Sequence, residues 1–333
     1  MPARRTESRL PANFQAADLG QAVTAEDGRC CLLSFATAPI VVNRENVYVA
    51  FVNDPVLAGD AQTFEWTFTE GGASPDVKTT SFGEVSYIPQ SSGYLDVKMR
   101  ILNSANSEQA SLTLTQEVTT PNPFLEAIIS QTNDEPGPGV GNPDVVRELV
   151  DDHAVYYDAV SLEKPEAGDG FQRFVSSIVY DGALERTASQ RKQHIEKIAE
   201  SLNNQVGDFA TLVSQGLGVC GIRLALLAMT VPQGSGTSPA LDWTELPELP
   251  PKRSFADVQL RQKLAALDED ARIDLFNLAR FPKSNINRCA KIIEILRDRY
   301  FAGTNFNDVL TGMNGTRAQR IVQHYRDGPL SRT

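Results

Sequence analysis

The sequence is poor in the residues that build disulfide frameworks and metal sites. Its 333 residues include four cysteines and three histidines. Cys30 and Cys31 are adjacent, so they lack the spacing of a zinc knuckle, and the histidines show neither an HxxxH nor an HExxH pattern. We therefore expect reduced thiols, no metal site and no cofactor.

Long apolar runs are also missing from the sequence. The longest candidate, residues 222–231, is much shorter than the roughly 18 residues of a membrane span and contains Arg223. The first residues include Arg4, Arg5 and Arg9 without the apolar block of a secretory signal. These features predict a protein that has no membrane span and is cytoplasmic at synthesis.

Positive charge is scarce except near the end of the chain. The net charge of −11 disfavours general binding to nucleic acids. Residues 121–278 hold 13 Lys or Arg against 24 Asp or Glu, whereas residues 279–333 hold ten against four. An acidic middle and a basic tail are thus expected, in a chain long enough for two or three domains.

Four segments in the first third of the chain have the composition of β-strands. They are rich in β-branched and aromatic residues and are separated by clusters of turn residues, as in a sandwich of short strands. The segments are residues 47–52, 63–69, 93–101 and 110–118. We therefore expect one β-sandwich over residues 37–119.

The alternation within these segments predicts which side chains face the core. Phe64, Trp66 and Phe68 share one face of their strand, as a half-buried antiparallel strand requires. In the third segment the free energy of hydrophobic transfer favours burial of one alternating set over the other. That set is Leu95, Val97, Met99 and Ile101, and Tyr94 precedes it where a sandwich often turns a corner.

These residues resemble the PKD family of immunoglobulin-like domains. The family pattern has an aromatic-x-Trp-x-Phe strand, a Gly-Tyr strand of alternating apolar residues, and an Asn-containing turn into the last strand. The matching positions here are Phe64, Trp66, Phe68, Gly93, Tyr94, Val97, Ile101 and Asn103. Where the family has an Asp-Gly-Asp-like turn after its Trp strand, this chain has Glu70, Gly71 and Gly72. The resemblance implies a spacer and binding module without catalysis.

Beyond the sandwich, the apolar spacing lengthens to that of α-helices. Residues 217–229 predict an apolar helix at the centre of a helical domain, and later segments predict further helices at residues 255–266, 270–279, 285–301 and 315–325. The fold class is therefore multidomain β plus α, an immunoglobulin-like or PKD-like β-sandwich followed by an all-α C-terminal region. The expected divisions are an arm (1–36), the sandwich (37–119), a linker (120–143), a helical domain (144–231), a Pro/Gly-rich loop (232–254) and a basic helical domain (255–333).

Cys220 is the candidate nucleophile. It stands in a Gly-Val-Cys-Gly sequence at the front of the predicted apolar helix, where a helix dipole stabilises a thiolate. However, His324 is the only downstream histidine that could activate the thiol. We expect instead a buried cysteine that packs among Leu224 and Leu227.

Residues 310–321 resemble the helix-hairpin-helix motif of DNA-binding proteins. Gly312, Met313, Ala318 and Ile321 fit the motif, and Asn314 stands where the family has its second glycine. Asn tolerates the left-handed backbone that this position requires. The resemblance implies that Gly312 and Asn314 lie at a phosphate-binding turn, with charge added by Arg317 and Arg320.

We expect a non-enzymatic binding or structural protein in which the sandwich and the helical domain make protein–protein contacts. Trp243, in the predicted loop, is a candidate contact residue because aromatic residues are enriched at interfaces. A PKD-like domain without a signal peptide also suggests a component or cargo of a phage-tail-like, contractile injection particle, by analogy with the immunoglobulin-like decorations of such particles. The alternatives are a Cys-dependent hydrolase or transferase in the helical region and DNA binding through the basic tail.

Overall fold

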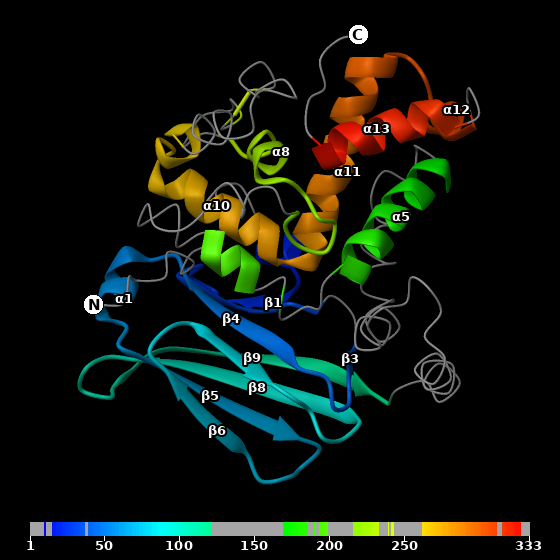
Figure 1. Ribbon diagram of the computed structural model, residues 1–333. Coiled ribbons are helices and arrows are strands. Elements are labelled where there is room, and N and C mark those ends of the chain that lie inside the picture. The colour runs from blue at the N-terminus through cyan, green and yellow to red at the C-terminus, as the bar shows by residue number, and fades with distance from the viewer. Residues whose placement is uncertain are drawn as a thin grey trace. The chain divides into compact units, whose positions relative to one another are not determined.

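The computed structural model describes residue 10 and residues 15–36, 39–120, 169–185, 190, 193–198, 216–232, 239, 241–242, 262–311 and 315–327. The chain divides into two compact units. The first, the two-sheet unit, contains the strands, and the second, the helical unit, contains the helices that follow residue 168 (Figure 1). The predicted order, a β-rich part followed by helices, is confirmed.

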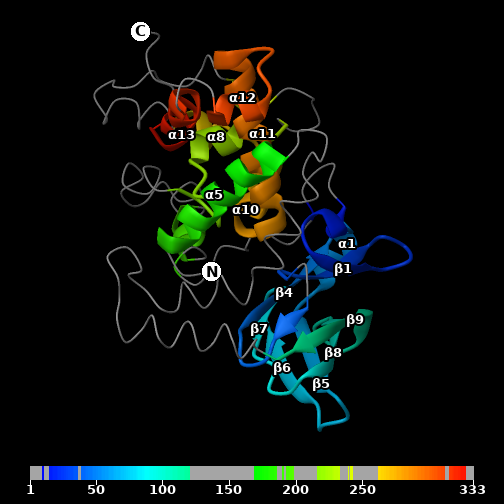
Figure 2. The same ribbon diagram turned by 90° about the vertical axis from the view of Figure 1, so that its right-hand side faces the viewer.

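The described strands form two sheets. The four-stranded sheet has the order β1 (Gln21–Thr24), β2 (Cys30–Ser34), β4 (Asn46–Val52) and β7 (Glu84–Tyr87). The five-stranded sheet has the order β3 (Ile40–Val41), β9 (Glu108–Thr119), β8 (Gly93–Leu102), β5 (Thr63–Glu70) and β6 (Asp76–Thr80). Only the β3–β9 pair among these is parallel. Figures 1 and 2 show β5, β8 and β9 side by side in one layer.

The predicted alternation of β5 is confirmed. Phe64, Trp66 and Phe68 are buried and the residues between them are half-buried, and Trp66 has no exposed surface. The indole N–H of Trp66 donates to Thr80 Oγ1 at 3.0 Å, so burial leaves its donor satisfied. The inward set predicted for β8 is buried as well, whereas Tyr94 is exposed.

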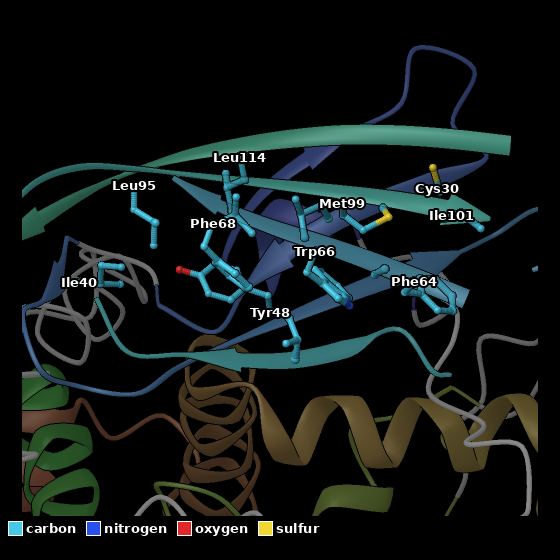
Figure 3. Close-up of a cluster of buried hydrophobic side chains, with 14 of the residues drawn as sticks. Cys30, Ile40, Tyr48, Phe64, Trp66, Phe68, Leu95, Met99, Ile101 and Leu114 are labelled. Carbon is cyan, nitrogen blue, oxygen red and sulfur yellow. The ribbon is translucent and has the colours of Figure 1, made fainter. Parts of the chain in front are cut away.

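Both sheets contribute to a single hydrophobic core. Cys30 and Tyr48 reach it from the four-stranded sheet, and the aromatic side chains of β5 reach it from the other sheet (Figure 3). The rings of Phe68 and Tyr87 stack across the two sheets with their centroids 4.1 Å apart. Each sheet therefore covers the apolar face of the other.

The predicted arm over residues 1–36 is wrong for its second half. Strands β1 and β2 lie there, after a short 3-10 helix, η1 (Ala16–Asp18), and β2 pairs with β4 along its whole length. All five residues of β2 are buried, so its sequence has no polar alternation to mark it as a strand. Strand β2 therefore belongs to the core of the two-sheet unit, although the predicted domain began only at residue 37.

The helical unit contains six helices with defined bounds in the described residues. They are α5 (Asp169–Glu185), α8 (Leu224–Ala228), α10 (Glu269–Arg280), α11 (Pro282–Phe301), α12 (Phe306–Thr311) and α13 (Thr316–Asp327). Asp268 caps α10 by accepting the N–H of Ala271 at 2.8 Å, and Pro282 occupies the first position of α11. The helices predicted over 270–279, 285–301 and 315–325 are confirmed, and residues 262–265 of that predicted over 255–266 are helical.

The helix predicted over residues 217–229 is wrong in extent. Only α8, five residues long, is helical, and residues 217–222 form a tight turn, which we name the Cys220 turn. Gly218 and Gly221 adopt φ angles of 67° and 58°, in the left-handed region that glycine enters without strain. Burial of the turn explains an apolar composition that resembled a helix.

The helices of the two predicted helical domains contact one another. Asn285 of α11 and Tyr325 of α13 both hydrogen-bond to the Cys220 turn. The described parts of residues 144–231 and 255–333 therefore belong to one unit. The linker predicted over 120–143 lies outside the described residues apart from Thr120, as does most of the loop predicted over 232–254.

We expect a fragment of residues 15–120 to fold, because it contains every described strand. Trp66→Ala should lower its free energy of unfolding by about 3–5 kcal/mol, because the substitution leaves a large cavity in the core. Thr67→Ala, on the outward face of β5, should change it by less than about 1 kcal/mol. Denaturant unfolding measures both, and equal effects would contradict the assignment of faces.

Candidate functional site

Glu70 is a buried carboxylate at the end of β5. Its Oε1 accepts the Tyr87 hydroxyl at 2.7 Å and the Gln90 N–H at 2.9 Å. Its Oε2 accepts the Ser91 N–H at 2.7 Å and the Ser91 hydroxyl at 2.9 Å. Because Tyr87 ends β7, this carboxylate connects the five-stranded sheet to the four-stranded sheet and to the segment that follows it.

These contacts lower the pKa of Glu70. Burial alone would raise the pKa, but the hydrogen bonds from Gln90, Tyr87 and Ser91 stabilise the ionised form and outweigh the cost of burial. Burial, together with the hydrogen bond to Glu70, raises the pKa of the Tyr87 hydroxyl, so this hydroxyl remains a donor. Glu70 is therefore ionised at neutral pH and holds the segment from residue 88 to residue 91.

Two exposed apolar side chains occur near the end of β5, Ile88 in the anchored segment and Tyr94 on β8. Ile88 is 46% exposed and Tyr94 is 66% exposed. The carbonyl of Ile88 accepts the Gln90 side-chain amide at 2.8 Å, and the carbonyl of Tyr94 accepts the N–H of Gly71 at 3.3 Å. We name Glu70, Ile88, Gln90, Ser91 and Tyr94 the Glu70 end.

Large exposed apolar side chains in the described residues occur on the two-sheet unit. They are Val56, Val77, Phe82, Ile88 and Tyr94. Val56, on α1 (Pro55–Asp60), belongs to the opposite end of the sheets, because α1 follows the end of β4 whereas Tyr87 pairs with the first residue of β4. The Glu70 end thus combines two exposed apolar groups with a fixed backbone, which suits an interface.

The edge strand β6 is poorly suited to pairing with another chain. Lys78, in the middle of β6, points inward and donates to Ser86 O at 3.0 Å. Its ammonium also lies over the rings of Phe68 and Tyr87, 5.6 Å and 5.3 Å from their centroids. An inward-pointing charge is a known protection against strand addition. The Glu70 end is therefore a better candidate than the β6 edge.

Cys220 is buried in the structure, with 2% of its surface exposed. Its N–H donates to Asn285 Oδ1 at 2.9 Å, and its carbonyl accepts the Tyr325 hydroxyl at 2.8 Å. The Asn285 amide also donates to the carbonyls of Leu217 and Ala279 at 3.2 Å each. These contacts hold the backbone on both sides of the thiol. The thiol is buried, as expected, but it does not lie at the start of a long helix, which was the predicted position.

The helix that carries His324 lies closer to Cys220 than their separation in sequence suggests. The neighbouring Tyr325 contacts the Cys220 turn, and burial raises the pKa of Tyr325, so its hydroxyl keeps the proton that it donates. The imidazole of His324, however, stacks on Tyr300 with a centroid distance of 4.0 Å and a 3.2 Å contact between Nδ1 and the Tyr300 hydroxyl. His324 therefore contacts Tyr300 of α11 through both its ring and its Nδ1 atom.

The predicted DNA-binding residues are only partly described. Gly312 and Asn314 lie outside the described residues, between α12 and α13. Arg317 and Arg320 lie in the first turns of α13, and their guanidinium groups stand 5.7 Å and 5.3 Å from the ring centroids of Phe301 and Tyr300. Both arginines therefore pack on aromatic rings of α11.

Trp243, the predicted contact residue, lies outside the described residues. Within the described ranges, no group of three or more His, Cys, Asp or Glu side chains is placed to hold a metal ion. The described helices include none that is long and apolar enough to cross a membrane. A scan against protein-family models and a search of curated proteins find no match to the chain.

The role of Glu70 was not predicted from the sequence, where this residue was only a departure from the turn of the PKD family. The available signal was its place in the alternation of β5, two residues after the buried Phe68. The donors come from residues 17 to 21 positions later. No local pattern connects Glu70 to these donors.

Glu70→Gln should destabilise the two-sheet unit at pH 7 by about 1–3 kcal/mol, because the amide cannot accept from all four donors. The stabilisation by the ionised carboxylate is complete above its unfolded-state pKa of about 4.3 and is lost as the pH falls through the lower folded-state pKa. The difference between wild type and variant should therefore shrink below about pH 4.

Denaturant unfolding across this pH range measures that difference. Glu117→Gln, at an exposed position on β9, is the matched control, and it should change the free energy of unfolding by less than about 0.5 kcal/mol throughout. A cost of Glu70→Gln that is the same at pH 3 and pH 7 would contradict the role of the charge.

The buried thiol of Cys220 should react slowly with iodoacetamide in the native protein and rapidly after denaturation. Cys289, which is also buried, should behave in the same way. Mass spectrometry after brief alkylation measures both sites. Rapid and selective modification of native Cys220 would favour an activated nucleophile instead.

Proposed function

We propose that this protein is a non-enzymatic binding or structural protein that contacts a protein partner through the Glu70 end. The observation that carries this proposal is the set of hydrogen bonds that fixes Gln90 and Ser91 on Glu70, with Ile88 exposed in the same segment and Tyr94 exposed on β8. A fixed backbone reduces the entropy that association must overcome. Exposed aromatic and aliphatic groups then supply apolar area for burial.

The same proposal takes the two-sheet unit to be an immunoglobulin-like domain of the PKD type. Support comes from the order of the strands, with β9, β8 and β5 adjacent in one sheet and β2, β4 and β7 adjacent in the other. Further support comes from Trp66, which lies at the centre of the shared core as the family pattern implies. Such domains act as spacers and binding modules.

The position of Cys220 supports binding over catalysis. A nucleophile must be reached by its substrate, whereas this thiol is buried and the backbone on both sides of it is held by Asn285 and Tyr325. The imidazole of His324, the only histidine after Cys220 in the sequence, stacks on Tyr300 of α11. These contacts account for Cys220 as a packing residue.

The proposal extends to a component or cargo of a phage-tail-like, contractile injection particle. An immunoglobulin-like domain with a fixed contact end could serve there as a decoration or as an attachment point. The partner would then be another subunit of the particle.

Site-specific photo-cross-linking in the native host tests the contact. Benzoylphenylalanine in place of Tyr94 should give one discrete cross-linked protein, because the ring would lie within the interface. The same group in place of Val56, at the opposite end of the sheets and 72% exposed, is the matched control and should give none. Equal products from both positions would reject the Glu70 end as the contact surface.

Mass spectrometry of the cross-linked product identifies the partner. A particle subunit would support the extension to a contractile particle, whereas a partner unrelated to any particle would reject that extension and leave the contact surface supported.

A further inference from the structure

The helical unit contains a cleft between α11 and the chain that follows α8. Its volume is about 460 Å³, which lies within the range of small-ligand and peptide sites, roughly 300–1,000 Å³. The wall from the chain after α8 is mainly apolar, with Met229, Val231 and Pro232, and Ile295 adds an apolar group from α11. Pro232 and Ile295 keep exposed surface, so they can bury an aliphatic side chain of a bound molecule.

The opposite wall comes from α11 and, apart from Ile295, is polar. Asn287, Lys291 and Glu294 are spaced four and three residues apart, so they follow one another along a single face of the helix. Arg288 joins the two walls, because its Nη1 donates to the carbonyl of Thr230 at 3.2 Å. The two cations and one carboxylate of this lining give it a net positive charge.

Lys291 is the cation best placed to meet a ligand. Its side chain is 56% exposed, whereas that of Glu294 is only 12% exposed. Its Nζ lies 4.0 Å from Glu294 Oε2, which is too long for a hydrogen bond, so the ammonium can exchange this contact for a closer one. A carboxylate at the mouth of the cleft would form a charge-assisted hydrogen bond with it.

We infer that this cleft binds a carboxylate joined to an aliphatic group, as in an acidic, apolar peptide segment of a partner protein. The aliphatic group lies against Pro232 and Ile295, and the carboxylate pairs with Lys291. The amide of Asn287 can donate to and accept from the peptide backbone. This inference concerns the helical unit and does not depend on the proposed contact at the Glu70 end.

Calorimetric titration of the full chain tests the chemistry with two matched probes, acetyl-Leu-Glu-amide and acetyl-Leu-Gln-amide. The Glu probe should bind with a Kd on the order of 0.1–1 mM, as expected for a ligand of this size. The Gln probe should bind roughly tenfold more weakly or worse, because it lacks the charge. Equal affinity of the two probes, or no binding of the Glu probe at about 10 mM, would overturn the inference.

Substitution of Lys291 tests the site. Lys291→Met should lower the affinity for the Glu probe by about tenfold. Lys291→Arg should largely preserve this affinity, because it retains the positive charge. Lys283→Met, on the first turn of α11 and outside the cleft, is the matched control and should leave the affinity within about twofold. An unchanged affinity of folded Lys291→Met would overturn the assignment to this cleft.

A third probe, 4-methylpentanoate, distinguishes the two sources of this chemistry. Weaker binding than the Glu probe supports a peptide segment, because the Asn287 contacts to the backbone are then used. Binding as tight as that of the Glu probe overturns the peptide assignment and indicates a free aliphatic acid.

Discussion

The hydrogen-bonded carboxylate of Glu70 is the constraint on which the architecture of the two-sheet unit depends at one end. An ionised carboxylate in a buried position is tolerated only when donors replace the lost water. Those donors come from Tyr87, at the end of β7, and from Gln90 and Ser91 after it. The need to satisfy one charge therefore fixes the course of a surface segment, and with it the position of Ile88.

In the helical unit, a neutral side chain, that of Asn285, satisfies buried polar groups of the backbone in the same way. Asn285 satisfies the N–H of Cys220 and two carbonyls around it, where the Cys220 turn has no helix to pair its backbone. Gly218 is required at this site, because a Cβ there would lie 2.3 Å from the Asn285 amide nitrogen. Cys220 is thus buried in a turn whose backbone is held on both sides.

The sequence predicted the parts of the fold that have a regular period. Strand β5 alternates apolar and polar residues, and α11 has a helical apolar stripe, so both were predicted close to their bounds, although α11 begins at Pro282, three residues before the predicted start. Strand β2 and the Cys220 turn were missed for a common reason. Both are buried on all sides, and full burial removes the alternation from which an element is recognised.

The candidate site was less predictable than the fold. Tyr94 was noted as a corner residue and Cys220 as a buried one, but the contacts of Glu70 join residues that are distant in sequence. Their pairing follows from the register of β5, β7 and β8, which depends on the whole core. The same holds for the cleft beside α11, whose walls come from residues almost 60 positions apart.

The proposed function depends on a contact surface and not on the Cys220 thiol. Co-purification of the partner from the native host distinguishes the contact surface from the thiol. It uses a Cys220→Ser variant and a variant that carries both Ile88→Ser and Tyr94→Ser. We predict that Cys220→Ser recovers the partner like wild type, whereas the double variant folds normally and loses it. Full recovery of the partner with the double variant, together with loss of biological activity in Cys220→Ser alone, would contradict the proposed function.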